Sequence, residues 1–370
     1  MYQSTIETNK SAIIVGASLC GLMTGLALAR TGWNVRILER TGSNPRSGAC
    51  LQVDSGDFDR SETAKLLRNL ASGGIRSVEA WSSVQSRLRA EIETDPRIEL
   101  YYDRRVETVD QDSDAAWAVT DKKELFRGDI LIGADGHRSI VRRHVAPDRP
   151  NAIFAGYMIW VAIVDEKDIP EKYRPALNAP VVDMPSGIGD FLLGSIVSGA
   201  DGSRAPGERR LGWAWYDNTR NKLLRQMGCV KGNLVHHSLN APDIPEATLI
   251  ELSRQAMERW PQPWLAATLQ SIKTRNITGI PIAEYVPDQL TNGRIVLVGD
   301  AAHVLTPLSA SGFNNSLQDA ATLADCMAKD IGGNGATIKE AISEYEALRL
   351  NHVRGAVQSG QAFSRSFGRK

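Results

Sequence analysis

The stretch that decides the fold is Arg294-Ile-Val-Leu-Val-Gly-Asp-Ala-Ala-His303, near the C-terminal end of the chain. Its first residues have the composition of a buried strand, and Gly299-Asp300 follows directly. Pro307 and the run Gly312-Phe313-Asn314 come next, which predicts a tight loop and then a turn that opens a helix. An acid at a strand end, followed by the free N–H groups of a helix N-terminus, is typical of a nucleotide-type site.

A second signal of this kind lies at the N-terminus. Ile13-Ile-Val-Gly16 predicts a strand, Leu19–Arg30 has helical spacing, and the strand Val35–Leu38 closes on Glu39-Arg40, which completes a β-α-β unit. The turn Gly16-Ala-Ser-Leu-Cys-Gly21 would direct helix N–H groups at a pyrophosphate, and Glu39 would accept from ribose hydroxyls. Two such signals at opposite ends of one chain predict a single long cofactor, and FAD fits best.

Bulk properties narrow the class of protein. The 370 residues suffice for two domains, and the 43 basic and 43 acidic residues cancel, so nothing indicates a nucleic-acid partner. No apolar stretch is long enough for a membrane span, and the first ten residues lack the centre of a signal peptide. The four cysteines are scattered, which favours reduced thiols and no metal site. We expect a cytoplasmic enzyme in which Cys20 fills space in the glycine-rich turn.

The first part of the chain continues with weaker patterns. Residues 41–60 have loop composition, and residues 61–94 have a helical pattern that breaks at Ser72-Gly73-Gly74. Alternating segments then predict a small antiparallel layer, followed by a buried strand that ends in Gly133-Ala-Asp135-Gly136. The segments of the expected layer are Ile98–Tyr102, Val106–Val109, Ala116–Thr120 and Glu124–Phe126.

The character of the chain changes between about 152 and 285. Long strands are expected at Tyr157–Val164, Phe191–Val197 and Leu211–Tyr216, with helices at 246–260 and 263–271. We interpret this region as an inserted substrate domain and residues 337–367 as an outer helix. The expected division is an FAD-binding domain at 1–150 and 281–335, a substrate domain at 151–280, and a C-terminal helical segment at 336–370.

Three motifs in order carry a family resemblance. They are Gly16-Ala-Ser-Leu-Cys-Gly21, Asp135-Gly136 within Gly133–Ser139, and Gly299-Asp-Ala-Ala-His303. With Pro307–Asn314 and Gly156-Tyr-Met-Ile-Trp160 beside them, the chain resembles the class A flavoprotein monooxygenases, the aromatic hydroxylase family, and within it the 2,6-dihydroxypyridine hydroxylase type. The resemblance covers about residues 11–350.

The resemblance implies both a fold and a reaction. The fold is α/β, with a Rossmann-like FAD-binding domain of the para-hydroxybenzoate-hydroxylase type, an inserted mixed-sheet substrate domain and C-terminal helices. FAD would be reduced by NADH or NADPH and would react with O2 to a flavin C4a-hydroperoxide. That species would hydroxylate an electron-rich aromatic or N-heteroaromatic compound in a site that excludes water. The expected protein is a monomer or homodimer whose partner is a small aromatic substrate.

This chain departs from the family pattern at several positions. Ser18 replaces the second glycine of the first motif, and Ala310-Ser311 replaces Gly-Gln. Trp81 stands where many members carry an arginine that reaches the pyrophosphate, and the segment 41–80 is short. The residues expected to bind FAD are Gly16, Ser18, Leu19, Gly21, Glu39, Arg40, Val106, Asp135, Asp300, Pro307, Ala310, Ser311, Gly312, Phe313 and Asn314.

The substrate residues are expected on the inserted sheet. Trp213 and Trp215 share one face of a strand and Tyr216 points to the other. If the tryptophans fill the core, Tyr216 faces the flavin, where its phenol could hydrogen-bond a substrate hydroxyl. Tyr216 and Pro307 are therefore the candidate catalytic residues, and Trp160, Trp213, Trp215 and Tyr216 the candidate substrate contacts. His236-His237 could supply a base, and His303 is expected to hold the loop.

Two other classes of function stay open from the residues alone. One is a flavin halogenase or reductase of similar fold. The pair Trp213-x-Trp215 is similar to a halogenase motif, but Tyr216-Asp217 follows where that motif continues with Ile-Pro. The other is a non-catalytic FAD protein that binds an aromatic ligand, which Trp81 and Ala310-Ser311 leave open.

Overall fold

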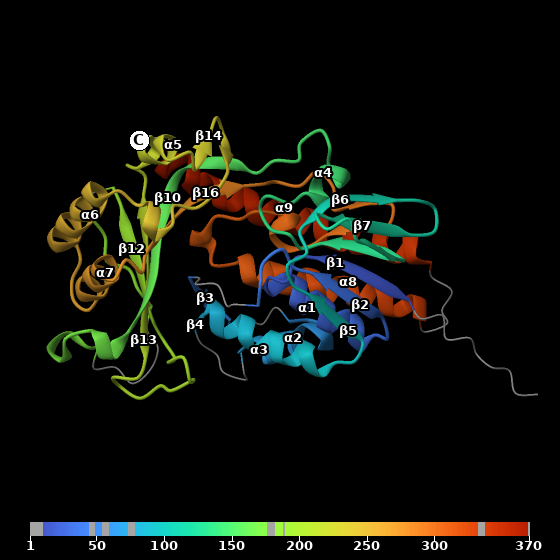
Figure 1. Cartoon of the computed structure of the whole chain (residues 1–370), viewed down its shortest axis with the longest axis horizontal. Helices are drawn as coiled ribbons and strands as arrows, with labels where there is room; N and C mark the ends of the chain where they lie inside the picture. The colour runs from blue at the N-terminus through green and yellow to red at the C-terminus, as the bar shows by residue number, and fades with distance from the viewer. Residues whose placement is uncertain are drawn as a thin grey trace, which may run out of the picture.

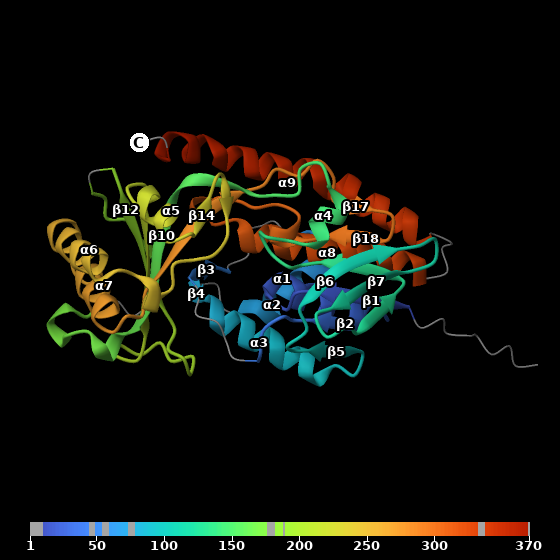
Figure 2. The ribbon, with the colours of Figure 1, turned by 45° about the horizontal axis from the view of Figure 1, so that its top comes forward.

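The computed structural model describes residues 10–43, 49–53, 59–72, 78–175, 182–187, 189–331 and 337–368. The predictions for residues 1–9, for Gly73-Gly74 and for much of the loop 41–60 lie outside the described residues. The chain forms two lobes side by side, each built on its own sheet (Figure 1). A long helix, α9, runs along the top of both lobes (Figure 2).

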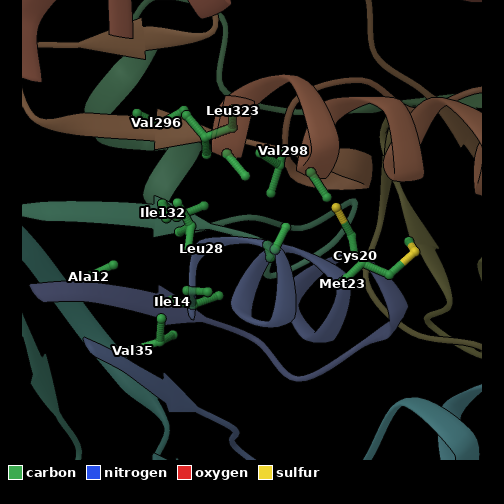
Figure 3. Close-up of a cluster of buried hydrophobic side chains, with 14 of the residues drawn as sticks. Ala12, Ile14, Cys20, Met23, Leu28, Val35, Ile132, Val296, Val298 and Leu323 are labelled. Atoms are coloured by element: carbon green, nitrogen blue, oxygen red, sulfur yellow. The ribbon is translucent and has the colours of Figure 1, made fainter. Parts of the chain in front are cut away.

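The first lobe is built on a sheet with strand order β17-β18-β9-β1-β2-β5, parallel throughout except for β17. Strand β1 has β2 on one side and β9 on the other, so the strand order reverses there. Helices α1, α3 and α8 pack together beside this sheet, and the three-stranded layer β6-β7-β8 contacts β1 and β9. Figure 3 shows the apolar core in which side chains of β1, α1, β9, β18 and α8 meet. The elements of this sheet and its helices are β1 (Ser11–Val15), β2 (Asn34–Leu38), β5 (Ile98–Tyr101), β9 (Ile130–Gly133), β17 (Thr291–Asn292), β18 (Ile295–Leu297), α1 (Leu19–Arg30), α2 (Glu62–Ser72), α3 (Trp81–Thr94), α4 (Val141–Val145) and α8 (Gly312–Ile331).

Two predictions for this lobe were wrong. The segment Ile98–Tyr101 was expected in the antiparallel layer, but it pairs in parallel with Val35–Leu38 at the edge of the main sheet. A half-exposed edge strand alternates like an antiparallel strand, so the pattern could not separate them. In addition, the regions expected to be loop and helix contain a short antiparallel pair. The smaller strands of this lobe are β3 (Cys50–Gln52), β4 (Val78–Ala80), β6 (Val106–Gln111), β7 (Ala116–Thr120) and β8 (Leu125–Gly128).

The second lobe is built on a sheet with strand order β11-β12-β13-β10-β15-β14, and β16 also pairs with β10. Every pairing described in this sheet is antiparallel, whereas a mixed sheet was expected. Strand β16 crosses the boundary expected at 280, so the division into domains stays a proposal. The elements are β10 (Ile153–Asp165), β11 (Val182–Asp183), β12 (Phe191–Val197), β13 (Arg210–Asp217), β14 (Val230–Lys231), β15 (Leu234–Val235), β16 (Thr278–Glu284), α5 (Asn221–Gln226), α6 (Glu246–Arg259) and α7 (Trp264–Lys273).

Helix α9 (Ile338–Phe367) joins the two lobes. It opens with a capping box between Thr337 and Glu340. Its first half bonds the first lobe, where the Tyr345 hydroxyl donates to the Leu297 carbonyl at 2.8 Å. Its last turns contact the second lobe, where the Ser364 hydroxyl donates to Glu284 at 2.6 Å. The expected outer helix is therefore a link between the lobes. Among the described helices, none is long and apolar enough to cross a membrane.

Candidate functional site

The carboxyl ends of β1, β2, β9 and β18 meet at one edge of the parallel sheet, at the point where the strand order reverses. Ligands of open α/β sheets bind at such points. A cavity of about 500 Å³ lies there. Both ends of the chain contribute to it, as the two motifs predicted. The predicted residues that line this cavity are Gly16, Ser18, Glu39, Arg40, Val106, Asp135 and Asp300.

The glycine-rich loop closes one side of the cavity. Gly16 has a φ of +104°, and a Cβ there would press on the Ala134 carbonyl. A Cβ on Gly21 would collide with the carbonyl oxygen of Gly16, so this glycine permits the close contact between loop and helix. Ser18 is the N-cap of α1, but its side chain makes no capping bond. Its hydroxyl and the positive end of α1, which begins at Leu19, remain available to an anion.

Glu39 fastens the end of β2 to the glycine-rich loop. Its Oε2 accepts from the Ala17 N–H at 2.9 Å, and its Oε1 accepts from the Thr41 N–H at 3.0 Å and hydroxyl at 2.7 Å. The buried carboxylate is thus held in position where it lines the cavity.

Gln85 is a site residue that the sequence did not reveal. It lies on α3, is buried, and its Nε2 donates to the Ala17 carbonyl at 3.3 Å. Its Oε1 is buried with no hydrogen-bond partner among the described residues. Trp81, the residue that the family pattern marked on this helix, packs partly buried against the apolar core of the first lobe. The α3 side chain that bonds the loop therefore lies one helical turn after the position that the family pattern marked.

Asp135 provides an unpaired acceptor on the opposite side of the cavity. Its Oδ2 accepts from the Ile140 N–H at 2.7 Å, whereas its Oδ1 is buried without a partner among the described residues. Desolvation by burial raises the pKa of Asp135. Burial and then the charge of Arg138 lower the pKa of His137 to about 4, so this imidazole is neutral at pH 7. The orphaned oxygen suits a donor on a bound ligand.

Cations surround the same cavity. Arg40, Arg104, Arg105 and Arg138 all line it. Together with the N-terminus of α1, these guanidinium groups favour an anionic ligand such as a pyrophosphate.

The loop after β18 forms the last wall. A 3-10 turn, η4 (Gly299–Ala301), brings Asp300 to the cavity with its side chain exposed. Arg142, which the sequence did not mark as a site residue, donates to the Ala301 carbonyl at 2.9 Å and to the Asp300 carbonyl at 3.2 Å. The Asp319 carboxylate accepts from the Gly299 N–H at 2.9 Å. The turn is thus held from both sides.

The segment that opens α8 lies outside this cavity. A second 3-10 turn, η5 (Pro307–Ser309), is followed by Ala310 in the left-handed conformation with φ +48°. At Gly312 a Cβ would meet no atom of the described residues within 4 Å, so among them space is open beside the helix N-terminus. Phe313 is buried in the core. The predicted residues that do not line the first cavity are Leu19, Gly21, Pro307, Ala310, Ser311, Gly312, Phe313 and Asn314.

Arg68 is a further residue that the sequence did not reveal. It lies on α2, is buried, and its Nη1 donates to the Asn314 Oδ1 at 2.8 Å. Its Nη2 donates to Asp59 at 2.9 Å, and Asp59 also accepts from Gln318 at 2.9 Å. The side chain of Asn314 is therefore turned toward α2. The pattern of α2 predicted only a helix, because nothing local indicates a partner 246 residues away.

The two faces of the sheet in the second lobe belong to different clusters. Three tryptophans that were expected to contact the substrate lie on the face covered by helices. Trp160, Trp213 and Trp215 were candidate substrate contacts, but all three are buried in the cluster formed with α6 and α7. Trp160 stands directly opposite Trp215 in the register, so the two share a face. Each indole N–H group has a partner. Trp160 donates to Asp217 at 3.1 Å, Trp213 to Ser271 at 3.2 Å, and Trp215 to Asp190 at 2.8 Å.

Tyr216 lies on the other face of the sheet, as strand alternation predicts. It belongs to a cluster against which Leu308 of η5 packs, so this face is the one turned to the loop after β18. The His303 Nε2 is 2.6 Å from Asp319, and both side chains are fully buried, which fits the expected role in holding the loop. His237 contacts the Ser238 carbonyl at 3.1 Å and lines a second, larger cavity.

Comparison with known proteins assigns the family. Residues 78–360, well over half of the chain, match the FAD binding domain family. The chain belongs to this family. It is a class A FAD-dependent aromatic hydroxylase, a flavin-dependent aromatic monooxygenase, as the motifs predicted.

Several relatives are similar over nearly the whole hydroxylase. The aurachin C monooxygenase/isomerase of Stigmatella aurantiaca is 26% identical over 96% of this chain and 90% of its own length. The 3-hydroxybenzoate 6-hydroxylase of Klebsiella oxytoca is 25% identical over 96% of this chain and 88% of its own. Two solved structures have the same fold. The 2,6-dihydroxypyridine-3-hydroxylase of Arthrobacter nicotinovorans has a TM-score of 0.75 at 19% identity, covering 98% of this chain and 93% of that one. Klebsiella pneumoniae HpxO, complexed with FAD and uric acid, has a TM-score of 0.68 at 19% identity, covering 98% and 89%.

The hydroxylase has a larger cavity of about 930 Å³ between the lobes. Arg40, Arg105 and Arg138 line both this cavity and the smaller one, so the two meet at these three side chains. Arg210 of β13 lines the larger cavity from the substrate lobe. A second anionic group would thus find cations directly beside the smaller cavity.

Proposed function

We propose that this hydroxylase inserts an oxygen atom from O2 into an electron-rich aromatic or N-heteroaromatic ring, with NADH or NADPH as the electron donor. The observation that carries the proposal is that the cavity, the loop after β18 and an aromatic face of the second sheet follow one another in space. The cavity at Gly16, Glu39 and Asp135 reaches Asp300, and the loop that follows in the chain packs through Leu308 on an apolar aromatic face of the second sheet. FAD, when bound, supplies the electron transfer and the activation of oxygen.

Specific residues would hold the two halves of FAD. The Gly16–Gly21 loop, Ser18 and the N-terminus of α1 would bind the pyrophosphate, and Glu39 would accept from the ribose. Arg40 and Val106 would flank the adenosine end, and the orphaned Oδ1 of Asp135 would accept from a ligand hydroxyl.

The flavin ring would lie at the N-terminus of α8. The exposed carboxylate of Asp300 would accept from the ribityl chain. The open space beside Gly312 leaves room for the polar edge of the ring, and the N–H groups at the start of this helix would donate to it. Ala310 takes the left-handed conformation that this turn needs.

The substrate would lie between the Pro307 loop and the aromatic face. The Tyr216 phenol would donate to a substrate hydroxyl, because desolvation by burial raises its pKa and keeps the phenol neutral. The apolar wall around it would keep water out, which limits the unproductive release of H2O2.

The cavity between the lobes would receive the nicotinamide donor. Arg40 and Arg105 are exposed and form no side-chain hydrogen bond or ion pair with another residue in the part of the chain that is described. Two guanidinium groups in this state favour a pyrophosphate. The relatives of this chain support the ring chemistry, since they include a 3-hydroxybenzoate 6-hydroxylase and a urate hydroxylase.

The test is a screen of the FAD-loaded protein. NADH and NADPH oxidation are followed with hydroxylated benzenes, pyridines, quinolines and purines, together with product formation and H2O2. We expect at least one ring compound to accelerate oxidation and to yield a hydroxylated product. A protein that binds FAD but shows no ring-dependent oxidation with any of these classes would contradict the proposal.

A further inference from the structure

We propose that the last turns of α9 form one wall of the ring pocket, and that Phe363 on this wall selects a flat, uncharged aromatic ring. The inference rests on the proposed function, because it assigns residues and ligand chemistry to the same site. It concerns a part of the chain that the motifs do not include, since the family resemblance ends at about residue 350.

Two stacked pairs of aromatic rings meet at this end of α9. Phe191 and Tyr216 of the sheet stack at 4.4 Å between centroids with an interplanar angle of 14°. Phe363 and Phe367 of α9 stack at 5.2 Å and 15°. The pairs cross each other edge to face, with Phe191 and Phe363 at 6.0 Å and 76°. This is the geometry that aromatic rings prefer, so the four side chains form one continuous surface.

This surface belongs to the flavin-facing side of the sheet. Leu308, from the turn after Pro307, packs against the same cluster, and so does Ala49, which precedes β3. Tyr216 is buried, whereas Phe191 and Phe363 each keep part of their surface exposed. The accessible aromatic area is therefore provided by the rings of β12 and α9 and less by Tyr216.

The end of α9 is fastened on the sheet side by close backbone contact. Gly156 has a φ of +88°, and a Cβ there would lie 2.8 Å from the Gly368 carbonyl oxygen. The Asn218 side chain donates to the Phe367 carbonyl at 2.7 Å. These contacts place Phe363 and Phe367 at a fixed distance from β10.

The end of α9 is fastened on the flavin side as well. A Cβ on Gly360 would collide with the methyl group of Thr306, so the absence of a side chain lets the helix approach the loop before Pro307. The hydroxyls of Thr306 and Tyr157 are 2.7 Å apart. Because both ends of the contact are held, the wall is a fixed part of the pocket.

The chemistry of the wall determines the class of ring. The side chains that form the cluster are aromatic and aliphatic. Transfer of a carboxylate to such a surface without a cation is unfavourable, whereas a flat ring gains stacking and apolar contact. We therefore expect an uncharged ring at this end of the pocket.

A binding titration of the FAD-loaded, full-length protein tests the proposal. The probes are 2-naphthol and 6-hydroxy-2-naphthoate, which differ by one carboxylate, and the signal is the change in flavin absorbance. We expect 2-naphthol to bind the wild type at least tenfold more tightly than the carboxylate. Phe363→Ala should weaken 2-naphthol about tenfold and Phe363→Leu less, because a smaller apolar side chain replaces the ring. Leu348→Ala, at an exposed position of the same helix, is the control and should leave both affinities unchanged.

Three results would overturn the proposal. The first is that 2-naphthol binds the wild type and both Phe363 variants with equal affinity. The second is that 6-hydroxy-2-naphthoate binds as tightly as 2-naphthol. The third is that the flavin absorbance of the wild type responds to neither probe. Circular dichroism shows whether Phe363→Ala is folded, and Phe363→Leu provides the measurement if it is not. The titration needs no turnover. Loss of hydroxylation with the expected binding pattern would therefore contradict the proposed function and leave the wall supported.

Discussion

At the scale of single residues, two glycines of the flavin motifs have opposite surroundings. A Cβ on Gly21 would collide with the Gly16 carbonyl oxygen, whereas a Cβ on Gly312 would meet no atom within 4 Å in the described part of the chain. Gly21 is therefore required by the packing of the protein itself. Gly312 has no such need within the protein, which is the behaviour expected of a position that leaves room for a cofactor.

This contrast gives the first prediction. Gly312→Val should change the free energy of unfolding of the apoprotein by no more than about 0.5 kcal/mol, because the new side chain enters open space. It should abolish FAD uptake. Gly21→Ala should destabilise the apoprotein by about 3 kcal/mol or more through overpacking. Urea unfolding of the apoproteins and FAD titration measure both effects. Normal FAD binding by Gly312→Val would show that the ring does not lie at this turn.

At the scale of elements, strand β13 divides two functions between neighbouring residues. Trp215 is buried against α6, with Trp260 edge to face at 5.1 Å and Asp190 bonded at 2.8 Å. Tyr216 is on the opposite face, in the cluster against which Leu308 packs. Alternation along one strand thus separates a stabilising residue from a candidate catalytic one.

The second prediction follows from this division. Trp215→Phe should lower the free energy of unfolding by about 1–3 kcal/mol, because the buried Asp190 loses a donor. It should leave the ratio of product to NAD(P)H consumed unchanged. Tyr216→Phe should do the reverse, with a small effect on stability and more H2O2 released per NAD(P)H. A loss of coupling in Trp215→Phe with none in Tyr216→Phe would mean that the assignment of the two faces is wrong.

Asp319 joins three elements of the first lobe. Its carboxylate bonds the Gly299 N–H, His303 and Arg349, which belong to η4, the following loop and α9. Burial alone would raise the pKa of Asp319, but the nearby charges of His303 and Arg349 outweigh this effect and hold its pKa below the usual value. The contribution to stability is therefore complete above the unfolded-state pKa near 4 and is lost as the pH falls below it.

The third prediction concerns this pH dependence. Asp319→Asn should cost about 3–5 kcal/mol at pH 7, because the buried Arg349 loses its counter-ion. The difference from the wild type should stay constant from pH 7 to about pH 5 and shrink below about pH 4. Urea unfolding at a series of pH values measures it. A difference that grows on acidification would contradict the lowered pKa.

At the scale of the whole molecule, the position of the lobes creates a cationic cavity beside the proposed FAD site. Arg104 lines only the smaller cavity and Arg210 only the larger one. These two arginines therefore allow the proposed cofactor and electron-donor sites to be separated.

The fourth prediction uses this pair. Arg210→Gln should raise the KM for NADH or NADPH about tenfold, since a charged hydrogen bond contributes roughly 1.5–3 kcal/mol, while FAD affinity stays unchanged. Arg104→Gln should weaken FAD and leave the KM unchanged. The KM of the wild type should also rise more steeply with salt than that of Arg210→Gln. An unchanged KM in Arg210→Gln would move the donor site elsewhere.

The sequence by itself determined the parts of this protein that depend on neighbouring residues. A strand that ends in glycine or an acid is a local backbone feature, so the turns at Gly16, Asp135 and Asp300 were predictable, and so was the family. The alternation of β13 likewise predicted which side chains face apart, because the period of a strand is two.

Only the tertiary structure decided the contacts that join distant segments. Periodicity records that a residue is buried but not its partner. The contacts of Gln85 with the glycine-rich loop, of Arg68 with Asn314 and of Arg142 with the Asp300 turn therefore had no signal in the sequence. The same holds for Phe363, whose helix pattern predicted an outer helix. Its place on the substrate sheet depends on close contacts of Gly360 and Gly368 with residues far away in the chain.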